Sequence, residues 1–287
     1  ETKKDLAFAP RIAAGPKIAD VAFISALFKE RGLAVTALNN YLECPWKYFY
    51  TNLLRIPKAP EKHQMYGIAV HAALKDFFDA FHDRKPDRKF LLMKFDYYLN
   101  EQPLTKGEFE EVGTRGRLAL GGWFDTYQGA WRTRTVTEVA IPAVFLGDDV
   151  RLTGKLDKVE FIGEGVEVNV VDYKTGRPKS RNEIEGKTQN SAGDIKRQLV
   201  FYNILLNGYD GGRRFKMASG EIDFVEPNER GKYIKESFLV TKDEIEELIE
   251  VIKRTAKEIT TLAFWDKRCD EPRCEYCALR EMMNEAR

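Results

Sequence analysis

The stretch that decides the fold is LTGKLDKVEFIGEGVEVNVVDYKT, from Leu152 to Thr175. Glu164-Gly165 predicts the two-residue turn of a β-hairpin, the connection that the right-handed twist of strands favours. This turn pairs Gly163 with Val166. The same register sets three further pairs opposite one another: Phe161 with Val168, Val159 with Val170, and Asp157 with Asp172.

Two carboxylates and a lysine meet at the far end of this hairpin. Side chains alternate along a strand, so Lys174 lies on the face that carries Asp157 and Asp172. The same face continues into apolar residues, and buried carboxylates must be protonated, paired or metal-bound. Ordinary solvent-side charge is the alternative, although Asp is depleted in strands. Because Mg²⁺ and Mn²⁺ take carboxylate oxygens, the pattern favours a site for one of these ions.

The composition is that of a globular protein with no sign of a membrane span. The chain has 287 residues, of which 43% are hydrophobic and 32% charged, and its formal net charge is +1. That charge does not by itself indicate a nucleic-acid binder, but it leaves room for local basic patches. We find no apolar run of membrane-spanning length and no signal peptide, so we expect no membrane association and a cytoplasmic location. The first residue is Glu1 rather than Met, which suggests a fragment of a longer protein.

The remaining sequence predicts helices around a set of strands. We expect a lead-in or linker over residues 1–16 and a single domain over 17–287. In the predicted second helix, Thr36 is the N-cap and Pro45 interrupts the backbone hydrogen bonds. In the third, we expect Ile68, Ala72 and Phe78 to be buried. The predicted helices before the hairpin cover 17–31, 36–54, 66–81, 88–100 and 108–130, and a strand follows over 133–146.

After the hairpin, we expect a polar loop over 176–194 and a helix over 195–208. Two strands near 214–226 and 232–239 and a last helix from Thr241 to about Phe264 complete the domain. This order predicts an α/β fold whose catalytic core covers about 133–240.

Three of the four cysteines crowd near the C-terminus. Cys274-x-x-Cys277 has the spacing of a metal-ligand pair, Cys269 lies just upstream, and Cys44 is far away in the sequence. Isolated buried cysteines are the alternative, but the surrounding tail is strongly charged. Four thiolates can hold Zn²⁺ or an iron–sulfur cluster, and the spacing alone does not decide between them.

Five motifs resemble, in order, those of the RecB-like branch of the PD-(D/E)XK nucleases, as found in AddA/AddB or UvrD-like helicase–nucleases. Any one of them is weakly specific, but together they span residues 36–280. They are the segment from Thr36 to Tyr48 with Cys44-Pro45, the segment from Gly67 to His71, Gly154-Lys155-Leu156-Asp157 with Val171 to Gly176, Gln198-Leu199 with Tyr202, and the cysteine tail.

The resemblance implies a restriction-endonuclease-like core, with a central mixed β-sheet flanked by helices, N-terminal helices and a C-terminal cysteine-rich staple. It implies that Mg²⁺ or Mn²⁺ is held by His71, Asp157, Asp172 and the backbone carbonyl of Tyr173. Lys174 would position and activate the attacking water, and Gln198 and Tyr202 would lie near the scissile phosphate or the DNA path. Without the resemblance, a lone histidine such as His71 is more often a hydrogen-bonded core residue.

The resemblance also implies a 4Fe–4S cluster on one early and three late cysteines, with structural Zn²⁺ as the alternative. The ligands would be Cys44, Cys269, Cys274 and Cys277. The third late cysteine of the family usually follows the C-x-x-C pair, whereas Cys269 precedes it here.

The implied function is hydrolysis of DNA phosphodiester bonds, as an exonuclease or endonuclease of DNA repair and recombination. The implied partners are DNA, as single strands or duplex ends, and a helicase domain or subunit. Three basic residues after the active-site strand could contact DNA or form a solvated face: Arg177, Lys179 and Arg181. One alternative is a catalytically idle DNA-binding or structural module with a nuclease-like fold, and another is a CRISPR adaptation nuclease.

Overall fold

Five strands form one mixed sheet in the computed structural model of the chain, which describes residues 19–81, 84–147 and 150–285. The expected lead-in over 1–16 lies outside these residues. The strands are hydrogen-bonded in chain order, and β3 and β4 run parallel while the other neighbours run antiparallel. Their bounds are β1 Thr135–Leu146, β2 Val150–Phe161, β3 Glu167–Lys174, β4 Lys216–Phe224 and β5 Ile234–Phe238.

The hairpin of β2 and β3 has the expected register. Phe161 lies opposite Val168 and Val159 opposite Val170. The amide of Ile162 donates to the carbonyl of Glu167 across the turn, at 2.8 Å. The last pair in this register is Lys158 with Val171. Continuing it by one residue places Asp157 opposite Asp172, as the sequence predicts.

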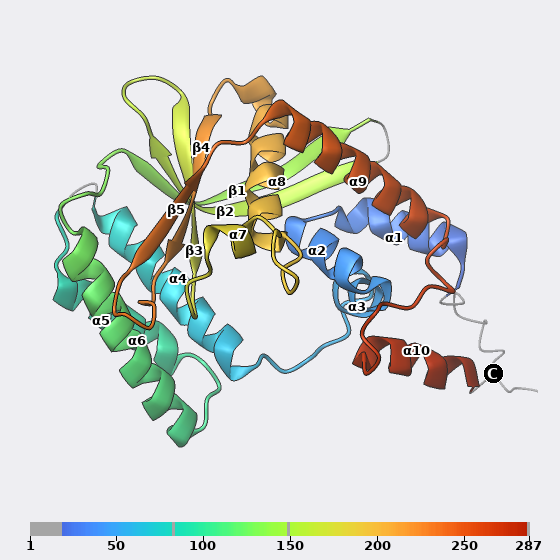
Figure 1. The fold of residues 1–287 in the computed structure, drawn as a ribbon, viewed down its shortest axis with the longest axis horizontal. Helices are drawn as coiled ribbons and strands as arrows, with labels where there is room; N and C mark the ends of the chain where they lie inside the picture. The colour runs from blue at the N-terminus through green and yellow to red at the C-terminus, as the bar shows by residue number, and fades with distance from the viewer. Residues whose placement is uncertain (1–18, 82–83, 148–149, 286–287) are drawn as a thin grey trace, which may run out of the picture.

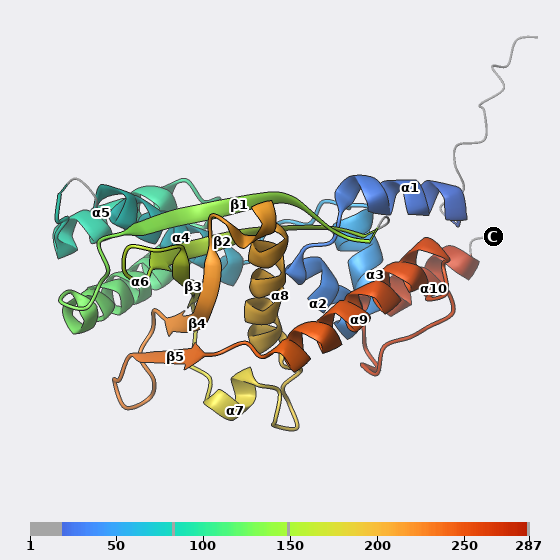
Figure 2. The ribbon, with the colours of Figure 1, turned by 90° about the horizontal axis from the view of Figure 1, so that it is seen from above.

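Helices cover both faces of the sheet (Figures 1 and 2). On one face, α8 (Asp194–Gly208) contacts β1 to β4, and its Leu199 shares a core with Val159, Val168 and Val170. On the other face, Tyr173 belongs to a second core that also contains residues of α4 (Lys62–Ala80), α5 (Arg88–Asn100) and α6 (Lys106–Tyr127). The two cores share the sheet, so β2 and β3 are buried on both sides.

The first and last helices lie together at the end of the molecule opposite α5 and α6 (Figure 1). They are α1 Val21–Arg31, α2 Val35–Glu43, α3 Pro45–Tyr48, α9 Lys242–Thr260 and α10 Glu275–Glu285. A π-helical turn, Phe49–Leu53, continues α3. Of the described helices, none combines the length and apolarity needed to cross a bilayer.

Two helix boundaries follow the expected signals and one does not. Gly32 ends α1 and Thr241 caps α9 through its side chain. The expected cap at Thr36 is wrong, because α2 begins at Val35 and its N-cap is Ala34, two residues earlier, which makes no side-chain cap. The reason is a tertiary contact: Leu33 pairs with β2, donating to the carbonyl of Arg151 at 2.8 Å, and this pairing sets where the chain turns into α2.

Three further expectations were incomplete or wrong. The segment 176–194 contains a short helix, α7 (Arg181–Ile184), with a capping box between Ser180 and Glu183. The cysteine tail continues into α10, which we did not predict. Ile68 is 53% exposed rather than buried, because it shares the open side of α4 with Gln64 and His71.

A buried ion pair lies on the side of the hairpin away from Asp157. The ammonium of Lys158 is fully buried, 2.9 Å from the Glu160 carboxylate and 3.8 Å from the centre of the Phe78 ring. Burial lowers the pKa of Lys158, and the Glu160 charge opposes this effect. The contact of Lys158 with Phe78 joins β2 to α4, on the reverse side of the strand that bears Asp157.

We expect Lys158→Ala to lower the free energy of unfolding by about 3 kcal/mol, because it leaves the buried Glu160 without its cation. Replacing both partners, as Lys158→Met with Glu160→Leu, should recover most of that loss, since no buried charge then remains unpaired. Urea unfolding of the single and double variants measures both values. Glu160 also accepts the Asn169 amide at 3.3 Å and lies 3.8 Å from Arg132. A cost below about 1 kcal/mol for the single variant would show that these two contacts already compensate Glu160.

Candidate active site

The first half of the site joins α4 to β2. His71, in the middle of α4, places Nδ1 3.3 Å from Oδ1 of Asp157. The other carboxylate oxygen of Asp157 accepts the backbone amide of Tyr173 at 3.0 Å. The Tyr173 ring points to the opposite face, where it stacks on Phe78. Asp157 is therefore held by one contact from a helix and one from the neighbouring strand.

The second half is a chain of contacts between β3 and α8. The Lys174 ammonium lies 2.7 Å from Oδ2 of Asp172 and donates to Oε1 of Gln198, also at 2.7 Å. The Gln198 amide donates to the Tyr202 hydroxyl at 2.5 Å, and that hydroxyl donates to Oδ1 of Asp172 at 3.1 Å. Gln198 and Tyr202 are one helical turn apart, which aligns them on one side of α8. The four residues thus close a ring of polar contacts.

The surroundings shift the pKa values of the two carboxylates in opposite directions. Burial acts to raise the pKa of Asp157, but the hydrogen bond and charge of His71 outweigh it and hold that pKa below its usual value. Burial raises the pKa of Asp172; Lys174 opposes the rise and the charge of Asp157 adds to it. The pKa of His71 is raised, because the hydrogen bond and charge of Asp157 outweigh burial. Asp172 is therefore the carboxylate with the greater need for a nearby cation.

The donor set fits a hard divalent cation. Asp172 is 2% exposed, and its Oδ2 receives no well-aligned hydrogen bond although Lys174 lies 2.7 Å away. The donors are two carboxylates and an imidazole, from β2, β3 and α4, and oxygen-rich sets of this kind suit Mg²⁺ or Mn²⁺. In the described residues their ligand atoms are not all within 4.8 Å of one another, as those of the four cysteines are. All six predicted side chains meet at one place, while their catalytic roles and that of the Tyr173 carbonyl remain predictions.

One positioning residue was not predicted. Glu226 follows β4 and accepts the backbone amide of Gly176 at 2.7 Å. Its carboxylate also accepts hydrogen bonds from Nη2 and Nε of Arg115, at 2.8 and 2.9 Å. Glu226 therefore fixes the backbone two residues after Lys174. Local sequence carries no signal for this contact, because it depends on the parallel pairing of β3 with β4 and on the placement of α6.

The three basic residues proposed for DNA contact lie in the segment after β3, where Arg177 and Lys179 line a pocket of about 370 Å³. Arg177 forms an ion pair with Glu183 at 2.8 Å, and Arg181 forms one with Glu236 at 3.0 Å. These carboxylates neutralise most of the charge that a phosphate would meet. DNA contact by Arg177, Lys179 and Arg181 stays a prediction, and the ion pairs of the two arginines weaken it.

The four cysteines converge into one cluster from two distant parts of the chain. Sulfur–sulfur distances are 3.7 Å for Cys44 with Cys277, Cys277 with Cys269, and Cys274 with Cys44, and all four sulfurs lie within 4.8 Å of one another. None of them forms a disulfide. Cys44 caps α3 and Cys277 lies in α10, so the cluster joins an early helix to the last one. Cys269 belongs to the cluster although it precedes the C-x-x-C pair.

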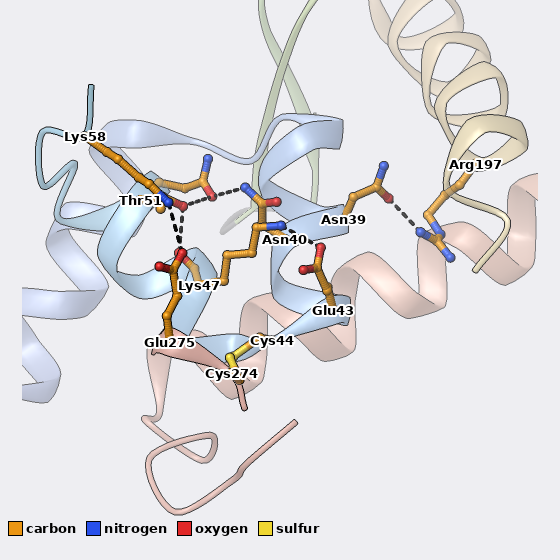
Figure 3. Close-up of polar contacts among 11 residues, drawn as sticks. Asn39, Asn40, Glu43, Cys44, Lys47, Thr51, Lys58, Arg197, Cys274 and Glu275 are labelled. Carbon is orange, nitrogen blue, oxygen red and sulfur yellow. Dashed lines mark hydrogen bonds and ion pairs between the residues drawn. The ribbon is translucent and has the colours of Figure 1, made fainter. Parts of the chain in front are cut away.

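Aromatic packing surrounds this cluster and leaves one side open. Trp46 is buried, packs edge-on against Trp265 and donates to the Lys267 carbonyl at 3.0 Å. Cys44 and Cys277 are buried, whereas Cys269 and Cys274 are partly exposed beside a pocket of about 740 Å³. Figure 3 shows Cys44 and Cys274 close together below α2 and α3. A bound metal here would tie both ends of the described chain together and stay reachable from solvent.

The comparisons with known proteins agree with this geometry. The sequence matches the family model of the PD-(D/E)XK nuclease superfamily over residues 32–282. The fold is similar to that of a candidate exonuclease from Eubacterium rectale, with a TM-score of 0.50 and 10% identity over 89% of this chain and 90% of that one. The structure of the protein SSO0001 is 14% identical over 73% of this chain and 93% of that one, but its TM-score of 0.34 is too low to support an argument. Among curated proteins, a sequence search finds no match.

Proposed function

The chain belongs to the PD-(D/E)XK nuclease superfamily, and from that premise we propose that it is a metal-dependent DNA nuclease of the RecB-like branch that uses Mg²⁺ or Mn²⁺. The observation that carries the proposal is the ring of contacts from Lys174 through Gln198 and Tyr202 to Asp172, with Asp157 and His71 beside it. An idle module has no need to hold a lysine between a buried carboxylate and an amide.

A bound divalent ion would neutralise charge on the phosphate and lower the pKa of water at this site. The proposed ligands are Asp157, Asp172, His71 and the Tyr173 carbonyl. Of the three N–H donors of Lys174, one goes to Gln198 and a second faces Oδ2 of Asp172 without a well-aligned hydrogen bond. The remaining donor is available to orient the attacking water or to stabilise charge on the phosphate oxygens.

Gln198 and Tyr202 act on Lys174 and Asp172 rather than on the reacting atoms. Burial, together with the charge of Asp172, raises the pKa of Tyr202 well above its usual value. Tyr202 therefore stays protonated at neutral pH and donates to one oxygen of Asp172, leaving the other to face a cation. Gln198 holds the Lys174 ammonium from the opposite side. Both are positioning residues in this proposal.

We propose that the cysteine cluster holds a structural metal centre. The resemblance to RecB-like nucleases favours 4Fe–4S. A single tetrahedral Zn²⁺ with bonds of about 2.3 Å places its sulfurs about 3.8 Å apart, which is close to the 3.7 Å found here. A four-iron cluster binds each thiolate through a different iron and needs a wider spacing. Iron and zinc analysis with a visible spectrum of the anaerobically purified protein decides: a brown, iron-loaded protein supports 4Fe–4S, and a colourless, zinc-loaded one supports Zn²⁺.

The biological setting follows from the same branch. We propose that the chain works beside a helicase domain or subunit in DNA repair or recombination, because RecB-like domains resembling this one occur in helicase–nucleases. Clustered thiolates without disulfides suit a reducing compartment, so we propose a cytoplasmic location.

The nuclease proposal is tested by removing and restoring the divalent ion. We expect cleavage of a labelled DNA strand in Mg²⁺ or Mn²⁺, none after dialysis against a chelator, and recovery when the ion is returned. Lys174→Met should reduce cleavage at saturating metal by about 100-fold or more, since one stabilising donor contributes about that factor. If neither single-stranded nor duplex DNA is cut under any of these conditions, the idle DNA-binding or structural module becomes the better interpretation.

A further inference from the structure

Arg197 lies next to Gln198 on α8, and no carboxylate pairs with it in the described part of the chain. Within the described residues, no acidic oxygen lies within 4.0 Å of its guanidinium. Lys47 and Lys58, on the same side of the molecule, each contact a glutamate, at 2.6 and 3.0 Å. Figure 3 shows this contrast: dashed lines from Lys47 and Lys58 lead to acids, whereas the line from Arg197 leads to an amide.

Neutral groups hold the Arg197 side chain in a fixed orientation. One end nitrogen donates to the side-chain oxygen of Asn39 on α2, and the other donates to the carbonyl of Ala192, both at 2.6 Å. The amide of Asn39 donates in turn to the Asp194 carbonyl at 3.4 Å. A guanidinium has five N–H donors in a planar fork, so three remain after these two contacts. The guanidinium of Arg197 is therefore already oriented in the absence of a ligand.

Arg197 bears its charge without a compensating partner. It is half-buried, and burial lowers its pKa, with only the charge of Asp194 acting in the other direction. Asp194 lies three residues earlier in the first turn of α8 but forms no ion pair with it among the described residues. Removing a cation from water without pairing it is costly. A half-buried, pre-oriented and unpaired guanidinium suits an anion with two acceptor oxygens, such as a phosphate.

The position of Arg197 relates this anion to the nuclease reaction. Arg197 directly precedes Gln198, whose side chain holds the catalytic lysine of the proposed mechanism. Adjacent residues of a helix point in different directions, so an anion at Arg197 lies on the side of α8 that faces Asn39 of α2, apart from the contact between Gln198 and Lys174. Resting on the proposed nuclease function, we propose that Arg197 binds a backbone phosphate of the DNA strand that flanks the scissile phosphate on the α2 side, and that Asn39 positions it.

The test measures how DNA binding depends on salt. In an Asp172→Asn background, which prevents cleavage, the affinity for a labelled oligonucleotide is measured by anisotropy across a salt series. We expect Arg197→Gln to weaken binding several-fold and to reduce the slope of log K against log salt by about 0.7–0.9, the loss of one phosphate contact. Arg197→Lys should keep the slope, because it keeps the charge, while losing part of the affinity. Arg254→Gln, on the exposed face of α9, is the matched control and should change neither value.

Two further readouts separate phosphate binding from a structural role. With Asp172 restored, Arg197→Gln should raise KM several-fold with little change in kcat, and Asn39→Ala should do the same more weakly at an unchanged salt slope. An unaltered slope in a folded Arg197→Gln protein overturns the inference, and so does a fall in kcat at unchanged KM. Wild-type protein that neither binds nor cuts DNA would instead overturn the proposed nuclease function.

Discussion

Asp172→Asn should abolish DNA cleavage while leaving the protein folded. The substitution keeps the size and one acceptor oxygen for Tyr202 but removes the charge that a divalent cation needs. Because the ion and its ligands supply several kcal/mol to phosphoryl hydrolysis, we expect a loss of about 1,000-fold or more, corresponding to about 4 kcal/mol. Initial rates of oligonucleotide cleavage at saturating Mg²⁺ measure it.

The same variant should be at least as stable as the wild type at neutral pH without added divalent ions. The pKa of Asp172 is raised, chiefly by burial, so its charged form is disfavoured in the folded state. The contribution of Asp172 to the free energy of unfolding is fully present at low pH, where the folded protein holds the proton. It is lost as pH rises through the pKa of Asp172 in the folded protein. The Asp172→Asn variant has no carboxyl to ionise at this position. The difference between its free energy of unfolding and that of the wild type should therefore shrink as pH falls.

Asp125→Asn, an exposed aspartate on α6 that pairs with Arg88, is the matched control, because exposed ion pairs contribute little. It should change neither cleavage nor stability appreciably. Cleavage by Asp172→Asn within tenfold of the wild type would sink the assignment of Asp172 as a metal ligand.

The parts of the site that could be predicted are those fixed by local geometry. The two-residue turn and strand alternation alone place Asp157, Asp172 and Lys174 together, and the register of β2 with β3 is the expected one. Gln198 and Tyr202 share a helix face by spacing, but their contact with Lys174 and Asp172 depends on how α8 packs across the sheet. His71 entered only through the family resemblance, since one histidine in a helix carries little signal.

The parts that could not be predicted depend on long-range packing. Glu226 reaches Gly176 because β3 pairs in parallel with β4, and no local pattern indicates that pairing. Lys158 and Glu160 read as solvent-side charges until α4 covers that face. Arg197 reads as the i+3 partner of Asp194, yet its side chain turns to Asn39 on another helix. For each of these charged residues, a second element that the local sequence does not indicate decides what the side chain contacts.

Cys277→Ser should produce the opposite phenotype to Asp172→Asn, a protein that is less stable but still catalytic. Cys277 is buried and lies 3.7 Å from both Cys44 and Cys269, so its loss removes a ligand from the centre of the cluster. Structural thiolate metal sites contribute up to about 10–16 kcal/mol. If Cys277→Ser loses only about 4 kcal/mol of this metal-derived stabilisation, Tm should fall by about 10 °C in a domain of this size. Thermal melting and metal analysis of the same preparation measure both effects.

The position of the cluster determines which function should survive its loss. The cysteines join α3 to α10, whereas Lys174, Asp172 and Gln198 lie on β3 and α8. At a temperature below both melting transitions, kcat should therefore stay within a few-fold of the wild type. Limited proteolysis should release the tail after about residue 265 in Cys277→Ser but not in the wild type. Ala256→Ser on α9 is the control, because it buries one hydroxyl without touching a thiolate. Full metal content and an unchanged Tm in Cys277→Ser would mean that the packing of Trp46 against Trp265 joins the two ends without a metal.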